Sequence, residues 1–123
     1  MAGKLLTHPS GVTTIREDWE ILAPTLDVAV HIRSGAAPVV AVHGELDLAG
    51  AEAFERLVAE VILRHGPDVV IDGSGVTFCD ARGLGALVRC ANEAQRSGGR
   101  LTLSDPAQRL RRLVRIVGLD HLM

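Results

Sequence analysis

Residues 67–88 read PDVVIDGSGVTFCDARGLGALV, and this stretch decides the fold of the chain. The apolar residues 69–71 predict a short buried strand that ends at the acidic, glycine-rich turn 72–75. Asp80 stands where a helix N-cap is expected, and an apolar-periodic helix follows from about Ala81. Folds of the α/β class present recognition surfaces where a strand ends beside the start of a helix. The stretch therefore predicts such a surface.

The composition is that of one ordered domain. The chain has 123 residues, of which 47% are hydrophobic and 23% charged, so it can bury a single core. Aromatic residues make up only 2%, which leaves little material for stacking on bases. A formal net charge of −2 argues against a surface built mainly for nucleic acid or an anionic membrane.

The two cysteines indicate a reducing compartment. Cys79 and Cys90 would lie about 15 Å apart along the predicted helix, whereas a disulfide needs Cα atoms within about 7 Å. No run approaches the roughly 20 apolar residues of a membrane span, and residues 1–15 show no apolar h-region of the kind expected in a signal peptide. We expect a soluble, cytoplasmic protein. Cys79 is either a small buried residue, which we favour, or a thiol whose pKa the helix N-terminus lowers.

The rest of the chain alternates between strand and helix patterns. Strands are predicted at 26–33 and 39–46, joined by a turn into an antiparallel hairpin. A helix opens at 47–50 and ends at Gly66-Pro67. The last strand is 101–103, and the last helix begins with Asp105 at the N-cap and Pro106 at N1.

This order, β-β-α-β-α-β-α, predicts an α/β domain. Strands that alternate with helices become parallel neighbours through right-handed crossovers, so we expect a small mixed four-stranded sheet with helices packed on it. The domain is predicted at 25–123, and residues 1–24 are predicted to be a partly flexible N-terminal arm. Strand 26–33 would be an exposed edge, which could pair with a second copy to form a homodimer.

Acidic residues gather at one end of the predicted sheet. The second strand ends at Asp47 and the third at Asp72, and the start of the following helix should lie beside them. Two carboxylates could serve acid/base catalysis, but no nucleophile, metal-ligand spacing or phosphate-binding lysine accompanies them. The pattern favours docking to a partner, without catalysis, metal or cofactor.

Four segments of the chain resemble the STAS family, and within it the bacterial anti-sigma factor antagonists. They are 42–47, 69–76, 78–87 and 116–119. The resemblance implies a non-enzymatic, cofactor-free regulator that binds an anti-sigma factor, typically a serine kinase of the histidine-kinase ATPase fold. Binding frees a sigma factor for transcription. The alternatives are a STAS scaffold or regulatory subunit of a membrane-associated transport ATPase, and a nucleotide-binding sensor.

The resemblance also implies which residues bind the partner. They are Asp47, Asp80, Ala81, Arg82, Gly83 and Leu84. Family members carry Ser or Thr at the position of Ala81, where a phosphate disrupts docking. Alanine has no hydroxyl, so this chain cannot be phosphorylated there. It would be a constitutive antagonist, a member regulated in another way, or an engineered form that mimics the unphosphorylated state.

Two other features remain open at this point. Gly83 and Gly85 cost the helix about 1 kcal/mol each, which either close packing on the sheet or the close approach of a partner would offset. The last helix has a basic face, formed by Arg109, Arg111, Arg112 and Arg115. A solvated face is the interpretation we favour, followed by contact with an acidic partner and, last, by DNA.

Overall fold

The computed structural model describes residues 4–7, 13–16 and 19–123. The main sheet has five strands, which lie side by side in this order: β3 (Glu20–Ala23), β4 (Leu26–His31), β5 (Val39–Leu46), β6 (Val69–Cys79) and β7 (Leu101–Ser104). The helices are α1 (Ala51–His65), α2 (Ala81–Arg96), α3 (Gln108–Ile116) and the 3₁₀ turn η1 (Asp120–Leu122). Strands β1 (Lys4–Thr7) and β2 (Thr13–Arg16) pair in a separate two-stranded sheet.

The sheet is mixed, as the sequence predicts. Strands β5, β6 and β7 run parallel to one another, and β4 pairs antiparallel with β5. The prediction of four strands is wrong, because β3 adds a fifth by pairing antiparallel with β4. Four residues followed directly by Pro24 give too short an alternation to indicate a strand, so only the pairing with β4 defines it.

This fifth strand changes two expectations about the N-terminal part of the chain. Residues 20–23 fall within the predicted arm, 1–24, but belong to the main sheet. Strand β4 has partners on both sides, so the edge proposed for pairing with a second copy is not free. The expected flexibility of the arm falls partly on residues 1–3, 8–12 and 17–18, which lie outside the described residues.

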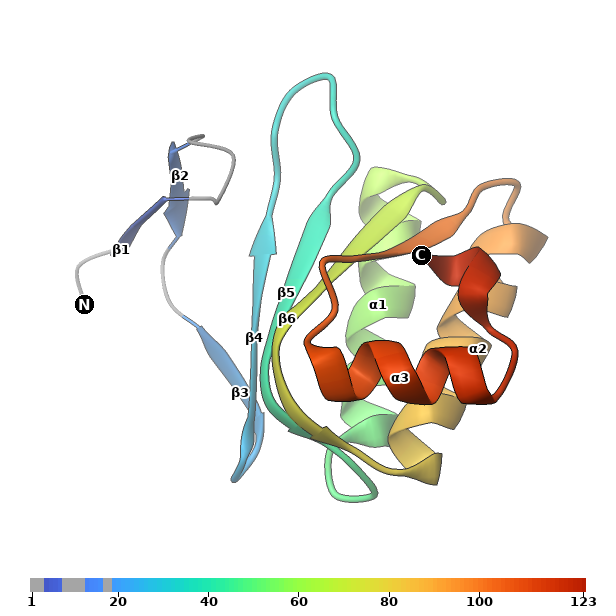
Figure 1. Ribbon diagram of the computed structural model, residues 1–123. Helices are drawn as coiled ribbons and strands as arrows, with labels where there is room; N and C mark the ends of the chain where they lie inside the picture. The colour runs from blue at the N-terminus through green and yellow to red at the C-terminus, as the bar shows by residue number, and fades with distance from the viewer. Residues whose placement is uncertain (1–3, 8–12, 17–18) are drawn as a thin grey trace.

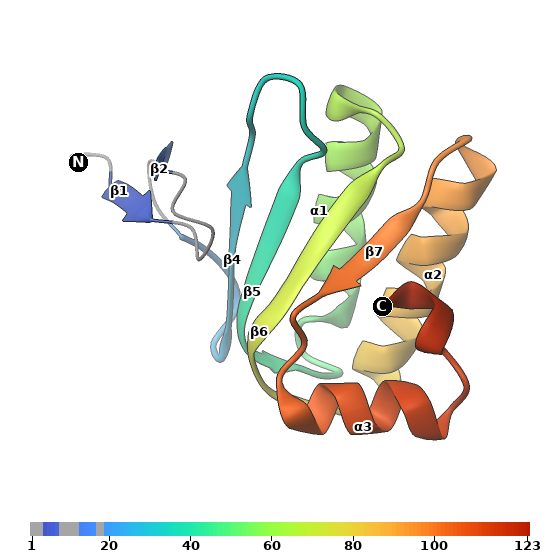
Figure 2. The ribbon, with the colours of Figure 1, turned by 45° about the horizontal axis from the view of Figure 1, so that its top comes forward.

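The helices form a layer over the sheet. Helices α1 and α2 cover one of its faces (Figure 1), and α3 crosses the end of the sheet next to β6 (Figure 2). The apolar side of α1 faces the sheet, since Phe54 and Val58 are completely buried. Leu84 and Leu87 anchor α2 in the same core. The sheet and helices thus share one apolar interior.

Strand β6 is much longer than the predicted 69–71. It continues through the expected turn to Cys79, with register shifts against β5 along its second half. Gly73 shows why glycine stands inside this strand. A Cβ atom there would lie 3.0 Å from the Leu110 side chain of α3, which packs directly over the strand. Glycine in this strand thus marks a close approach between elements.

Helix α3 begins later than predicted. Asp105 has a φ of 47° and so cannot be the N-cap, which is Ala107. The backbone N–H of Ala107 donates a 3.0 Å hydrogen bond to the carbonyl oxygen of Gly73. This bond ties the start of α3 to the middle of β6. The turn at Asp105 redirects the chain from β7 toward that contact.

Candidate docking site

Two parallel strands bring Asp47 and Asp80 to the same end of the sheet. Leu46 and Cys79 are paired in the register of β5 and β6, and each is followed directly by one of the two aspartates. The backbone N–H of Asp80 donates to the carbonyl oxygen of Leu46 at 3.3 Å. The predicted proximity of Asp47 and Asp80 therefore follows from the register of the two strands.

Asp80 caps α2 and also holds the neighbouring loop. Its Oδ1 accepts a 2.9 Å hydrogen bond from the N–H of Gly83, as an N-cap does. Its Oδ2 accepts a 3.4 Å bond from the N–H of Leu48, which lies in the loop between β5 and α1. Asp47 shapes the same loop by accepting a 3.0 Å bond from the N–H of Ala49. Both carboxylates thus position backbone around the start of α2.

The first turn of α2 has an exposed side and a buried side. Ala81 and Arg82 are exposed, whereas Gly83 and Leu84 are buried. A Cβ atom at Gly83 would overlap the carbonyl oxygen of Leu46, so close packing on β5 explains this glycine. A Cβ atom at Gly85 would meet only the end of the Arg89 side chain. Of the predicted partner-binding residues in this turn, Ala81 and Arg82 are therefore accessible to a partner, whereas Gly83 and Leu84 pack beneath them.

Asp72 does not belong to this site. It lies within β6, where it pairs with Ala41 on one side and Ser104 on the other, and its Oδ1 accepts a bond from the N–H of Ser74. Its predicted position beside Asp47 is wrong because β6 runs on to Cys79. The pair of carboxylates that suggested acid/base catalysis is therefore not assembled.

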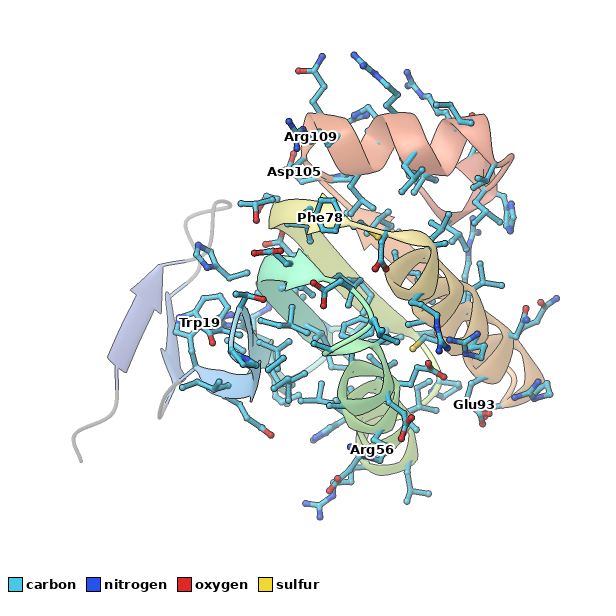
Figure 3. All side chains as sticks on the ribbon, turned by 90° about the horizontal axis from the view of Figure 1, so that it is seen from below. Trp19, Arg56, Phe78, Glu93, Asp105 and Arg109 are labelled. Atoms are coloured by element: carbon cyan, nitrogen blue, oxygen red, sulfur yellow. The ribbon has the colours of Figure 1, made fainter. Side chains whose placement is uncertain are left out.

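Two exposed apolar side chains beside the capped helix were not predicted from the sequence as site residues. Leu48 is 62% exposed in the loop that Asp80 holds, and Phe78 is 43% exposed near the end of β6 (Figure 3). Phe78 lies two residues after the buried Val76, so strict strand alternation would bury it. A large apolar side chain in a loop next to an N-cap is the signal that could have identified Leu48.

The thiol beside the site is chemically quiet. Burial, the Asp80 carboxylate and the Asp47 carboxylate together raise the pKa of Cys79 to about 12. Its Sγ donates a 3.6 Å hydrogen bond to the carbonyl oxygen of Asp80. The alternative of a lowered thiol pKa is therefore wrong, because burial and two acidic neighbours outweigh the helix N-terminus.

Within residues 4–7, 13–16 and 19–123, no group of three or more His, Cys, Asp or Glu side chains is arranged to hold a metal ion. No helix in the same ranges has the length and apolar character needed to cross a membrane.

The fold and the capped helix together define a STAS-type α/β domain. A family model described as "Mlab, STAS domain" matches residues 31–123. The chain therefore belongs to the STAS domain family.

Two similar proteins are named as anti-sigma factor antagonists. The anti-sigma-B factor antagonist of Bacillus subtilis strain 168 is 33% identical over 85 residues, which cover 68% of this chain and 76% of that protein. The crystal structure of an anti-sigma factor antagonist from Mycobacterium paratuberculosis is 31% identical, has a TM-score of 0.64, and covers 82% of this chain and 86% of its own.

The anti-sigma factor antagonist SpoIIAA in its unphosphorylated form shares the fold. Its TM-score is 0.68 at 21% identity, with coverage of 78% of this chain and 84% of its own.

Proposed function

We propose that this chain is an anti-sigma factor antagonist. It binds an anti-sigma factor and so leaves less of that protein free to hold its sigma factor, which is competition by mass action. Two relatives with more than 30% identity carry this functional name, and this similarity supports the assignment. The role requires no catalytic group and belongs in the cytoplasm, where transcription takes place.

The docking face that we propose is formed by Asp47, Leu48, Phe78, Asp80, Ala81 and Arg82. The observation that carries the proposal is the exposure of three residues around Asp80: Leu48, whose N–H Asp80 holds, Phe78 near the end of β6, and Ala81 directly after Asp80. Apolar side chains next to a few polar ones are typical of protein interfaces. Gly83 is packed against the backbone of Leu46, so the face is preorganised, which lowers the entropic cost of binding.

The partner that we propose is a kinase-type anti-sigma factor of the histidine-kinase ATPase fold. In the relatives that the sequence resembles, such a kinase phosphorylates the residue directly after the helix-capping aspartate. Ala81 occupies that position here and is exposed, but it offers only a methyl group. We infer that this chain stays competent to bind in the presence of kinase and ATP, so its activity is set by its amount or by another signal.

A pairwise binding experiment tests the proposal. Purified kinase-type anti-sigma factors are titrated with the chain, with Ala81→Glu and with Ala36→Glu, and the Kd is measured by calorimetry. Ala36 is exposed in the turn between β4 and β5, at the other end of β5 from the docking face, so this control makes the same change elsewhere.

We expect Ala81→Glu to weaken binding at least tenfold, because it adds a bulky charge beside Asp80, while Ala36→Glu keeps the original Kd. Equal Kd values for both variants would remove the docking face from the interface. The two alternative functions predict other ligands. A STAS scaffold or regulatory subunit would bind a membrane-associated transport ATPase, and a nucleotide-binding sensor would show a higher melting temperature with GTP or ATP.

A further inference from the structure

A groove lies next to the docking face, between the end of β6 and α3. Its volume is about 230 Å³, and most of its lining is apolar: Val76, Phe78, Leu110, Leu113 and Ile116. Figure 3 shows Phe78 on β6 facing the end of α3 that carries Arg109. The groove joins the docking face because Phe78 lines both and is separated from Asp80 by a single residue.

Two of the apolar residues that line the groove are exposed to solvent. Phe78 is 43% exposed and Ile116 is 73% exposed, and Val117 follows at 46%. Large apolar side chains gathered on one surface mark a site of interaction more often than the same residues scattered singly. The core does not need these side chains, since Leu110 and Val114 already anchor α3.

The charged side chains that line the groove are both arginines. Helix α3 contains four arginines and no acidic residue. Arg109 and Arg112 line the groove, whereas Arg111 and Arg115 do not. In the part of the chain that the structure describes, no carboxylate forms an ion pair with any of these four. The groove thus combines an apolar floor with two cations that form no ion pair with any carboxylate of the described residues.

We propose that this groove receives an acidic amphipathic segment of the anti-sigma factor. The apolar side chains of the segment would pack on Phe78, Leu113 and Ile116, while its carboxylates pair with Arg109 and Arg112. The inference rests on the proposed function and extends it, because it names a second contact with the same partner. Continuity with the docking face places both contacts within reach of one protein.

The same arginines would attract nucleic acid or an anionic membrane, but the groove favours a protein segment. Phosphate binding uses charge and gains little from an apolar floor. Helix α3 is only nine residues long, and the chain carries a net charge of −2, so no extended basic stripe is present on this helix.

Two matched pairs of variants test whether the groove contributes to binding. Each variant is titrated with an anti-sigma factor that binds the unmodified chain. Arg112→Glu is compared with Arg115→Glu, which makes the same charge change on the same helix outside the groove. Ile116→Ser is compared with Leu63→Ser, another highly exposed aliphatic residue, on α1. Kd is measured by calorimetry at about 50 and about 200 mM salt, and melting curves confirm folding.

We expect Arg112→Glu to raise Kd about tenfold and to weaken its salt dependence, whereas Arg115→Glu changes Kd less than about threefold. Ile116→Ser raises Kd about fivefold, and Leu63→Ser leaves it unchanged. Equal effects of both arginine variants on Kd, or no effect of Ile116→Ser, would overturn the proposal that the groove binds the anti-sigma factor.

The outcomes separate this inference from the proposed function. If Ala81→Glu abolishes binding while the groove variants bind normally, the groove is not part of the interface with the anti-sigma factor. The proposed antagonist role is then retained. If the unmodified chain binds no anti-sigma factor, both fail. The variants are also tested for binding to a DNA duplex and to anionic phosphatidylserine vesicles. If either ligand binds, both arginine variants weaken that binding equally and Ile116→Ser does not change it, the proposal that a protein segment occupies the groove is overturned.

Discussion

A Cβ atom at position 83 would overlap the carbonyl oxygen of Leu46, so Gly83 holds the first turn of α2 directly against the end of β5. The same turn receives its N-cap bond from Asp80, which also accepts a bond from the N–H of Leu48. Strand end, loop and helix start are therefore fixed relative to one another. The close approach explains a glycine that costs the helix about 1 kcal/mol.

The two glycines of this turn should respond differently to alanine. Gly83→Ala forces a methyl group onto backbone that cannot move aside, so we expect the free energy of unfolding to fall by about 1–3 kcal/mol. At Gly85 the new methyl would meet only the flexible guanidinium of Arg89, at 3.2 Å. Gly85→Ala should be neutral or stabilise the protein by up to about 1 kcal/mol. Urea unfolding of both variants measures the difference, and equal stabilities would contradict the packing argument.

The cap at Asp80 should be visible in stability as well as in binding. Asp80→Ala removes the acceptors for two backbone N–H groups, and we expect a loss of about 0.5–2 kcal/mol. Asp80→Asn keeps a side-chain oxygen that can accept from Gly83 and should retain most of the stability. Thermal and urea unfolding measure both variants. A fully stable Asp80→Ala would show that the cap contributes nothing.

The cysteines should be slow to react in the folded protein. Burial is the main cause that raises the pKa values of Cys79 and Cys90 to about 12, so both stay protonated near pH 8. We expect thiol reagents to react much faster after urea unfolding, where the ordinary pKa of about 8.5 applies. The unfolded chain loses these protons at lower pH than the folded one, so stability should fall as the pH rises from about 9 toward 12. Equal reaction rates with and without urea would contradict this.

A hydroxyl at position 81 should make the chain a substrate of the proposed kinase partner. Ala81→Ser places an exposed Oγ at the start of α2, to which a kinase docked as proposed would transfer the γ-phosphoryl group of ATP. We expect one added phosphate by mass spectrometry and, after phosphorylation, at least tenfold weaker binding. The unmodified chain serves as the control and should gain none. A binding kinase that leaves Ala81→Ser unmodified would contradict the assignment of this position.

The mixed sheet and the helices over it follow from local patterns. Period-two apolar residues predict β4, a nearly continuous apolar run predicts β5, and stripes that include Phe54 and Val58 predict the buried faces of the helices. Asp80 was recognisable as an N-cap because aspartate is among the preferred residues at that position, but the same rule failed at Asp105, where the chain turns before α3 begins. These features depend on neighbours in the sequence, so the sequence alone predicts them.

What the sequence did not reveal depends on contacts between distant segments. Glycines normally indicate a turn, but in β6 they allow the strand to continue beneath α3, where Gly73 faces Leu110. That extra length moves Asp72 away from the site and brings Phe78 to it. Strand β3 was hidden for the same kind of reason, since four residues become a strand only through their pairing with β4.

Competition for the anti-sigma factor is the direct measure of the proposed antagonist role. A preformed complex of a kinase-type anti-sigma factor with its sigma factor is mixed with increasing amounts of this chain in the presence of ATP, and free sigma factor is measured by size-exclusion chromatography. We expect sigma factor to be released in proportion to the added chain, Ala81→Glu to release at least tenfold less, and ATP to leave the release unchanged. Sigma factor that stays in its complex at every ratio, although the anti-sigma factor binds other antagonists, would contradict this role.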